Sequence, residues 1–136
     1  MDESLAQAVR ERAGYACEYC RILQRFYPTV TFPIDHIIAL HHRGKTILDN
    51  LALSCLPCNS FKGPNIAGID SRTRKLTGLF NPRRHTWSRH FRWDGPRIIG
   101  RTPIGRVTVE VLKLNDPEAV MIRAELIDEG VFPPTD

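Results

Sequence analysis

Apolar residues recur at helical spacing near the start of the chain, where Leu5, Ala6, Val9 and Ala13 are interspersed with charged side chains. Because residues three and four apart share one face of a helix, this pattern predicts a short amphipathic helix. Gly14 follows where a left-handed C-cap would lie, and we expect the helix to end there.

The middle of the chain has a strand pattern that changes to a helix pattern. Residues 32–40 are rich in β-branched and aromatic side chains, and residues 51–55 form a second short apolar run. The polar stretch 41–50 is long enough to join two antiparallel strands. Pro57 suits the first turn of a following helix. The pattern predicts strand, loop, strand and helix, whereas residues 21–31 form a connection of uncertain shape.

The last part of the chain is expected to contain a hairpin. Residues 97–99 and 107–111 have the composition of two strands, and residues 102–105 read as the turn between them. Residues 63–76, in contrast, contain few bulky apolar side chains and are expected to run irregularly over the surface.

A final helix is expected to begin at Pro117, after a cap at Asn115 or Asp116, and to end at Gly130. Its buried face would include the apolar residues Val120, Ala124 and Ile127. Short strands in the middle and helices around them predict an α+β fold.

A chain of 136 residues is long enough for one modest core. We expect residues 1–71 to form the core unit and residues 72–136 to form a basic C-terminal extension, packed together as one domain. No apolar run reaches the roughly 18 residues that span a bilayer, and the N-terminus lacks a signal-peptide pattern. These observations predict a cytoplasmic protein without a membrane partner.

Positive charge is concentrated in one part of the chain. Residues 72–106 carry 10 Lys or Arg side chains against a single acidic residue, Asp94. Residues 1–71 carry 7 basic and 7 acidic groups, and residues 107–136 carry 2 basic and 7 acidic groups. This distribution indicates a polyanion binder, because basic side chains neutralise phosphates and release condensed counterions. The alternative is a solvated surface that only maintains solubility.

Two Cys-x-x-Cys pairs, Cys17 with Cys20 and Cys55 with Cys58, predict a metal site. In a reducing compartment such pairs favour metal over disulfides. Four thiolates complete a tetrahedral zinc ion and leave no position for water, so we expect a structural Zn²⁺. The alternative is four buried cysteines with no connection to one another.

Further motifs accompany the cysteine pairs in a fixed order: DHI at residues 35–37, then Asn50, then CLPCNSFKG at residues 55–63. Over about residues 10–63 the combination resembles the HNH endonucleases. The resemblance implies a small ββα-metal core with a structural zinc held by four cysteines, to which the C-terminal β-hairpin and helix are added as an extension. It also implies hydrolysis of phosphodiester bonds.

The resemblance assigns roles to individual residues. His36 corresponds to the general base that activates water, and imidazole titrates near neutrality. Asp35 and Asn59 correspond to ligands of a catalytic ion, and their oxygen atoms suit Mg²⁺ or Mn²⁺. Asn50 corresponds to the residue that holds the loop and orients the base.

Some of these residues have alternative readings. Asp35 and His36 could instead form a buried salt-bridged pair within a strand. His41 and His42 lie where family members often carry Pro, Ser or Gly, and we expect them to be ordinary loop residues. Lys62 is a candidate phosphate contact, although it could equally complement its surroundings on the helix.

Arginines alternate with aromatic residues between residues 79 and 93. The arginines are candidate phosphate contacts, which position a nucleic acid without reading its sequence. The aromatic residues could stack on bases, but we expect Trp87, Phe91 and Trp93 to be core, because a small domain needs large apolar anchors. The predicted nucleic-acid contacts are therefore Lys62, Arg83, Arg84, Arg89 and Arg92.

These observations predict a metal-dependent endonuclease that nicks or cuts double-stranded DNA and leaves a 5′-phosphate. The alternative function is a zinc-stapled nucleic-acid-binding module without cleavage activity. Both functions share the basic segment, and only the first requires Asp35, His36 and Asn59 together. Action within a larger assembly is compatible with either function.

Overall fold

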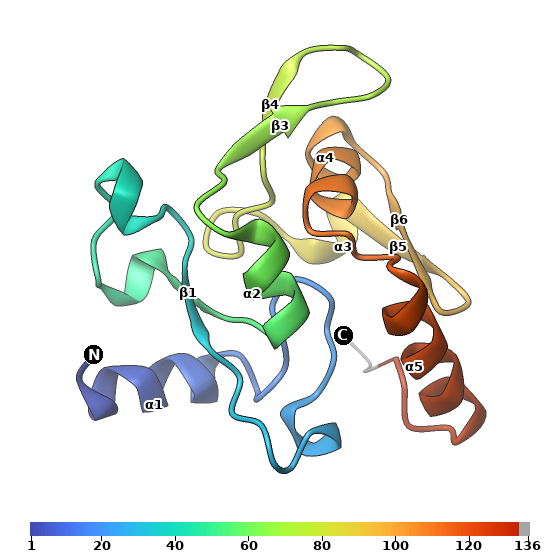
Figure 1. The fold of residues 1–136 in the computed structure, drawn as a ribbon, viewed down its shortest axis with the longest axis horizontal. Helices are drawn as coiled ribbons and strands as arrows, with labels where there is room; N and C mark the ends of the chain where they lie inside the picture. Colours follow the sequence, from blue (N-terminus) through green and yellow to red (C-terminus); the bar gives the residue numbers. More distant parts are fainter. Residues whose placement is uncertain (134–136) are drawn as a thin grey trace.

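The computed structural model describes residues 1–133 and contains short helices and three two-stranded antiparallel sheets (Figure 1). The α-helices are α1 (Glu3–Arg12), α2 (Leu56–Lys62), α3 (Trp87–His90), α4 (Pro103–Val111) and α5 (Pro117–Asp128). The strands are β1 (Ile34–His36), β2 (Leu51–Leu53), β3 (Ala67–Ile69), β4 (Leu76–Gly78), β5 (Phe91–Asp94) and β6 (Arg97–Gly100). Three 3₁₀ helices are η1 (Gln24–Phe26), η2 (Leu40–His42) and η3 (Leu48–Asn50).

The order strand, loop, strand and helix predicted for the middle of the chain is confirmed. β1 pairs antiparallel with β2, with Asp35 opposite Ala52, and α2 follows directly after β2. Both strands are shorter than predicted. A 3₁₀ helix begins at Leu40, soon after β1, and β2 ends at Leu53 because Cys55 already caps α2. Pro57 lies in the first turn of α2, as expected, and the helix ends at Gly63, whose φ is 50°.

Helix α1 confirms the predicted amphipathic helix and ends just before Gly14, as expected. The Asp2 side chain accepts a hydrogen bond from the Ser4 backbone N–H, which caps the first turn. Val9 is fully buried on its inner face. Gly14 follows with a φ of 63°, a conformation that glycine adopts without steric cost.

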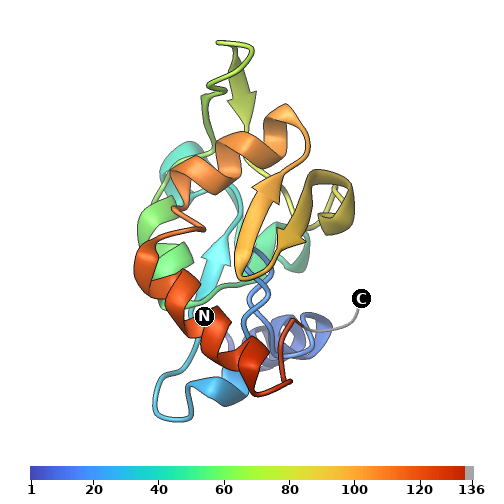
Figure 2. The ribbon, with the colours of Figure 1, turned by 90° about the vertical axis from the view of Figure 1, so that its right-hand side faces the viewer.

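The predicted strand at residues 107–111 is wrong, because these residues lie in α4. Thr102 caps this helix by accepting from the Gly105 N–H, and Pro103 occupies its first turn. The C-terminal hairpin exists, but it consists of β5 and β6 (Figure 2). Residues 63–76 also differ from expectation, since β3 and the start of β4 lie within them and form a second hairpin.

The final helix, α5, matches the predicted segment, but its caps and its buried face do not match fully. Asp116 occupies the N-cap position without a side-chain cap bond. Asn115 instead bonds both the N–H and the C=O of Ile98. The most buried side chain of α5 is Arg123, whereas the predicted apolar face is only half-buried.

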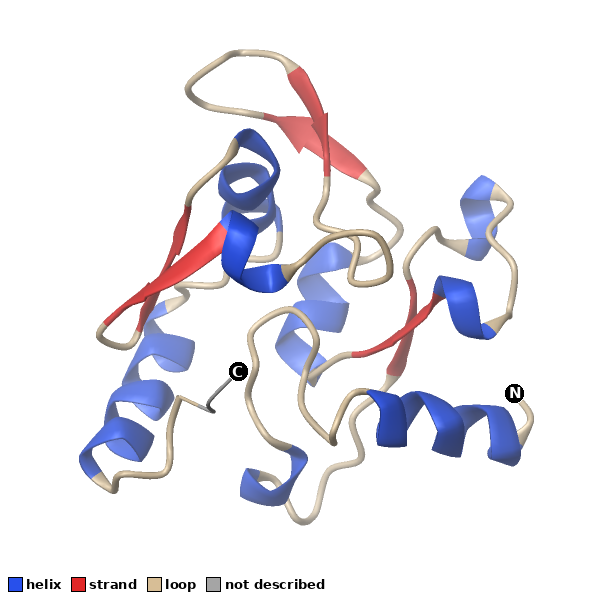
Figure 3. Ribbon diagram, turned by 180° about the vertical axis from the view of Figure 1, so that it is seen from behind, coloured by secondary structure: helices blue, strands red, loops and turns tan. Residues whose placement is uncertain are grey.

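One hydrophobic core includes residues from both halves of the chain. Figure 3 shows the helices and strands that contribute to it from behind. Trp87 and Phe91 are 6% and 1% exposed, so they belong to this core and are not free to stack on bases. The Trp87 indole N–H donates to the Tyr19 carbonyl at 2.8 Å. This bond ties the basic segment to the first cysteine pair. Among the described residues, no helix combines the length and the apolar character that a bilayer crossing requires.

Candidate functional site

Three of the predicted site residues meet at one hollow of about 250 Å³. β1 supplies Asp35 and His36, and α2 supplies Asn59. The complete lining is Ile34, Asp35, His36, Ala39, Leu40, Asn59, Gly63 and Pro64. The β1–β2 pairing and the start of α2 after β2 bring these residues together, although Asp35 and Asn59 lie far apart in the sequence.

Asp35 is buried and forms an ion pair with Lys62, whose Nζ lies 3.1 Å from Oδ2. The Tyr19 hydroxyl also donates to Oδ2, at 2.7 Å. Burial raises the pKa of Asp35, while Lys62 and Tyr19 oppose that shift by stabilising the carboxylate. Burial and the neighbouring Asp35 raise the pKa of Tyr19 well above its usual value, so Tyr19 keeps its proton and remains the donor.

Lys62 occupies a different position from the one expected of a phosphate contact. Its side chain is 1% exposed, and its ammonium donates to Asp35 and to the His36 carbonyl at 3.0 Å. The four-carbon stem carries the charge under β1, away from the surface. The sequence left open a buried salt-bridged pair of Asp35 and His36. The structure does contain a buried pair at this place, but the partner of Asp35 is Lys62.

His36 is partly exposed, and a loop residue holds its ring. Nε2 lies 2.9 Å from the Thr46 hydroxyl oxygen. The His36 backbone is fixed independently, because its carbonyl accepts from Lys62 and it pairs with Leu51 in the sheet. The imidazole therefore has a defined place beside the hollow.

Asn50 closes the loop between the two strands. Its Oδ1 accepts from the Ile38 N–H at 2.9 Å, and its Nδ2 donates to the carbonyls of Ile38 and Lys45. Gly44 permits this closure, since a Cβ there would lie 1.7 Å from the Ile38 carbonyl oxygen. His41 and His42 lie on the outer side of the loop and are exposed.

The four cysteines form a cluster that is compatible with a metal ion such as zinc. All four are buried, and their sulfur atoms lie within 4.8 Å of one another. The Sγ atoms of Cys20 and Cys55 are 3.6 Å apart. Zn–S bonds of about 2.3 Å place tetrahedral ligands about 3.8 Å apart, so the observed spacing suits that geometry.

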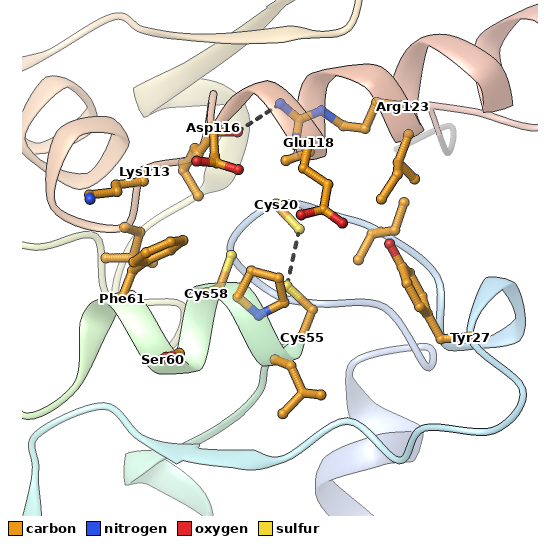
Figure 4. Close-up of a pocket in the computed structure, with 17 residues that line it drawn as sticks. Cys20, Tyr27, Cys55, Cys58, Ser60, Phe61, Lys113, Asp116, Glu118 and Arg123 are labelled. Carbon is orange, nitrogen blue, oxygen red and sulfur yellow. Dashed lines mark hydrogen bonds between the residues drawn. The ribbon is translucent and has the colours of Figure 1, made fainter.

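A cavity of about 450 Å³ opens beside the cysteine cluster, between α2 and α5 (Figure 4). Cys20, Cys55 and Cys58 lie on one side of it, and Arg123 lies on the other. Arg123 is 2% exposed and donates to the carbonyls of Pro96 and Leu114. Its buried guanidinium would complement the negative charge that four thiolates carry when they hold a metal ion.

The predicted basic contacts separate into two groups. Arg84, Arg89 and Arg92 are exposed on the surface. Arg83 is only 11% exposed and forms an ion pair with Glu18, which in turn accepts from the Leu53 N–H. Arg83 therefore joins the basic segment to the first cysteine turn and to β2, and its charge is already neutralised.

Sequence reasoning missed the supporting residues of this site. Tyr19 lies inside the first Cys-x-x-Cys turn, where only its position between two ligands could have drawn attention to it. Thr46 lies in a polar loop and carries no motif. Their roles depend on contacts over 16 and 10 residues of sequence, which no local pattern reveals.

The geometry of the site agrees with a family comparison. Residues 17–65 match the family model described as HNH endonuclease. The matched stretch contains both cysteine pairs, β1, β2 and α2. Over this stretch the chain is similar to HNH endonucleases, and this similarity indicates nuclease-type activity on a nucleic acid substrate. Comparisons with curated proteins and with solved structures found no match.

Proposed function

We propose that this chain is a metal-dependent HNH endonuclease that hydrolyses DNA phosphodiester bonds, by nicking or cutting, and leaves a 5′-phosphate. The observation that carries this proposal is the convergence of Asp35, His36 and Asn59 on one hollow. β1, β2 and α2 would then be its ββα-metal core.

Asp35 and Asn59 would hold Mg²⁺ or Mn²⁺. A carboxylate has about four lone-pair positions, and the bonds from Tyr19 and Lys62 use only part of this capacity. Asn59 lines the hollow, where its amide oxygen would complete the site. Both donors are hard oxygen ligands, which suit these ions. When bound, the ion neutralises the charge that develops on the phosphate.

His36 would act as the general base. If Nε2 carries the proton and donates to Thr46, the lone pair of Nδ1 is left to accept a proton from water. The water oxygen then bonds to phosphorus while the bond to the 3′ oxygen breaks, and that oxygen takes a proton from solvent, which yields a 3′-hydroxyl and a 5′-phosphate. Asn50 supports this step by keeping the loop, and with it Thr46, in place.

The cysteine cluster would hold a structural Zn²⁺. Four protein ligands leave no open position on the ion, so its contribution is to join two chain segments. One segment contains Tyr19, which donates to Asp35, and the other begins α2, which carries Asn59. The zinc would therefore support two of the residues at the hollow.

A plasmid assay tests the proposal. Supercoiled DNA is incubated with the protein and Mg²⁺ or Mn²⁺, with His36→Ala and the exposed loop variant His41→Ala beside the wild type. We expect the wild type and His41→Ala to cleave the plasmid, and the cleavage rate of His36→Ala to be lower by at least about 100-fold. Equal cleavage by His36→Ala would reject its assignment as the base. Binding without cleavage under either ion would favour the zinc-stapled binding module.

A further inference from the structure

The hairpin of β3 and β4 stands out from the body of the protein (Figures 1 and 2). Its two strands pair from Ala67 opposite Gly78 to Ile69 opposite Leu76. The connecting residues carry three basic side chains, Arg72, Arg74 and Lys75, and all three are exposed. The hairpin therefore presents a concentrated positive charge at its tip.

A buried carboxylate organises this tip. Asp70 is fully buried, and its two oxygens accept from Arg106 of α4 at 3.0 and 3.1 Å. Oδ2 also accepts from the Thr73 N–H. The Asp70 backbone N–H donates to the Lys75 carbonyl, and the Asp70 carbonyl accepts from the Arg74 N–H. The hydrogen bonds from Arg106 hold the pKa of Asp70 well below its usual value. The tip is thus a defined structure and not a loose loop.

The charges of the tip remain available for a ligand. Asp70 is the only acidic residue between Ala67 and Gly78, and Arg106 already neutralises it. Within the part of the chain that the structure describes, no ion pair involves Arg72, Arg74 or Lys75. Three uncompensated charges on one projecting element suit a polyanion.

The hairpin also has a fixed relation to the hollow. Gly63 and Pro64 line the hollow, and β3 begins three residues later at Ala67. On the other side Gly68 packs against α4, where a Cβ would lie 3.0 Å from both Val107 and Val111. The hairpin therefore follows the hollow directly along the chain, and packing against α4 fixes its position.

We propose that the β3–β4 hairpin is a DNA-contacting ribbon whose residues Arg72, Arg74 and Lys75 bind phosphates of duplex DNA beside the cleaved bond. This inference rests on the proposed function for its choice of DNA. A two-stranded ribbon has dimensions that the major groove admits. The exposed apolar residues that flank the tip, Ile69 and Leu76, suit contact with the sugar edges of the groove.

The test measures binding separately from cleavage, on the His36→Ala background. Fluorescence anisotropy with a labelled DNA duplex gives Kd at several salt concentrations without added Mg²⁺ or Mn²⁺. The test variant combines Arg72→Gln, Arg74→Asn and Lys75→Gln. Asn is used at position 74 because its φ is 66°, a conformation that Asn tolerates. The control removes the same charge elsewhere through Arg25→Gln, Arg97→Gln and Lys113→Gln.

We expect the test variant to raise Kd at least about 10-fold. The slope of log Kd against log salt concentration should fall by about one unit for each phosphate that the variant no longer binds. The control should keep the parent slope. A single Arg72→Gln variant should lower the slope by about one unit, which guards against a folding defect in the triple variant.

Two results would overturn the inference. The first is a test variant that binds like the control, and the second is a parent protein that binds single-stranded DNA or RNA in preference to duplex DNA. The proposed function fails by a different measurement, namely the absence of plasmid cleavage by the wild type with either Mg²⁺ or Mn²⁺. Loss of hairpin-dependent binding and loss of the nuclease assignment can therefore be told apart.

Discussion

The hydroxyl of Tyr19 lies 2.7 Å from the Oδ2 atom of Asp35, and both groups are buried. Tyr19 stands between Cys17 and Cys20 in the first cysteine turn, while Asp35 lines the hollow of the candidate active site. One hydrogen bond thus joins the cysteine cluster to the hollow, and a change at either place reaches the other directly.

Replacing Tyr19 with Phe removes this bond and leaves Lys62 as the donor to Asp35 Oδ2. We expect a loss of about 1–3 kcal/mol of stability, because a buried acceptor loses a partner. The Mn²⁺ concentration for half-maximal cleavage should rise as Asp35 becomes less well oriented. Plasmid cleavage over an Mn²⁺ titration measures this effect. Tyr15→Phe is the control, since Tyr15 is exposed; equal behaviour of the two variants would contradict the role of Tyr19.

The Asp35–Lys62 pair gives a double-mutant prediction. Lys62→Met leaves a buried carboxylate without its counter-ion and should cost about 3–5 kcal/mol of stability. Adding Asp35→Asn removes the uncompensated charge and should restore much of that loss, without restoring cleavage. Urea unfolding of the single and double variants measures the coupling between the two residues. Additive effects would mean that the pair does not act as a unit.

Removal of the metal should unfold the region that the cysteines join. Cys17→Ser takes one of four ligands away, so we expect loss of bound zinc and a fall in Tm on the order of 10 °C. Native mass spectrometry reports the metal, and thermal melting reports the stability. Wild-type protein treated with a chelator should match the variant, and added zinc should rescue only the wild type. A folded, active and zinc-free preparation would rule out the structural ion.

Because of His85 and His90, we expect the folded protein to lose stability at mildly acidic pH. Their rings are 5.0 Å apart, and His85 Nδ1 accepts from the Asn81 N–H. Burial lowers the pKa of both side chains, and the nearby charges of Arg84 and Arg89 add to the effect at His85 and His90 respectively.

The unfolded chain therefore binds protons at a higher pH than the folded chain does, and stability falls as pH drops through the unfolded pKa of about 6.5. Melting curves between pH 7.5 and 5.5 should show this fall. It should be smaller in His85→Gln/His90→Gln than in the wild type, whereas His41→Gln, at an exposed position, should leave it unchanged. An identical pH profile in the double variant would exclude the two histidines as its source.

The sequence predicted which candidate site residues lie together better than it predicted the elements of the C-terminal half. Cys17, Cys20, Cys55 and Cys58 follow a spacing that metal chemistry requires, and the structure clusters them. The hollow likewise contains Asp35, His36 and Asn59, which a motif identifies. The residues that support them could not be predicted, because the contacts of Tyr19 and Lys62 depend on how separate segments pack.

Helix α4 shows why local composition predicted the wrong element at residues 107–111. Val107, Thr108 and Val111 favour a strand on composition alone. The Thr102 cap and the burial of Val107 and Thr108 against the core favour a helix instead, and tertiary packing outweighs β propensity. Gly105 permits the close packing, since a Cβ there would lie 2.0 Å from the His90 carbonyl oxygen.

The three bonds of Asn50 have a consequence for how this protein can diversify. They close the loop through backbone atoms of Ile38 and Lys45, so the shape of the loop does not depend on the side chains along its outer edge. His41, His42 and Arg43 lie on that edge and are exposed. Substitutions at His41 and His42 should therefore leave Asp35, His36 and Asn59 in place, whereas Arg43, with a φ of 69°, restricts its position to residues that tolerate a left-handed backbone.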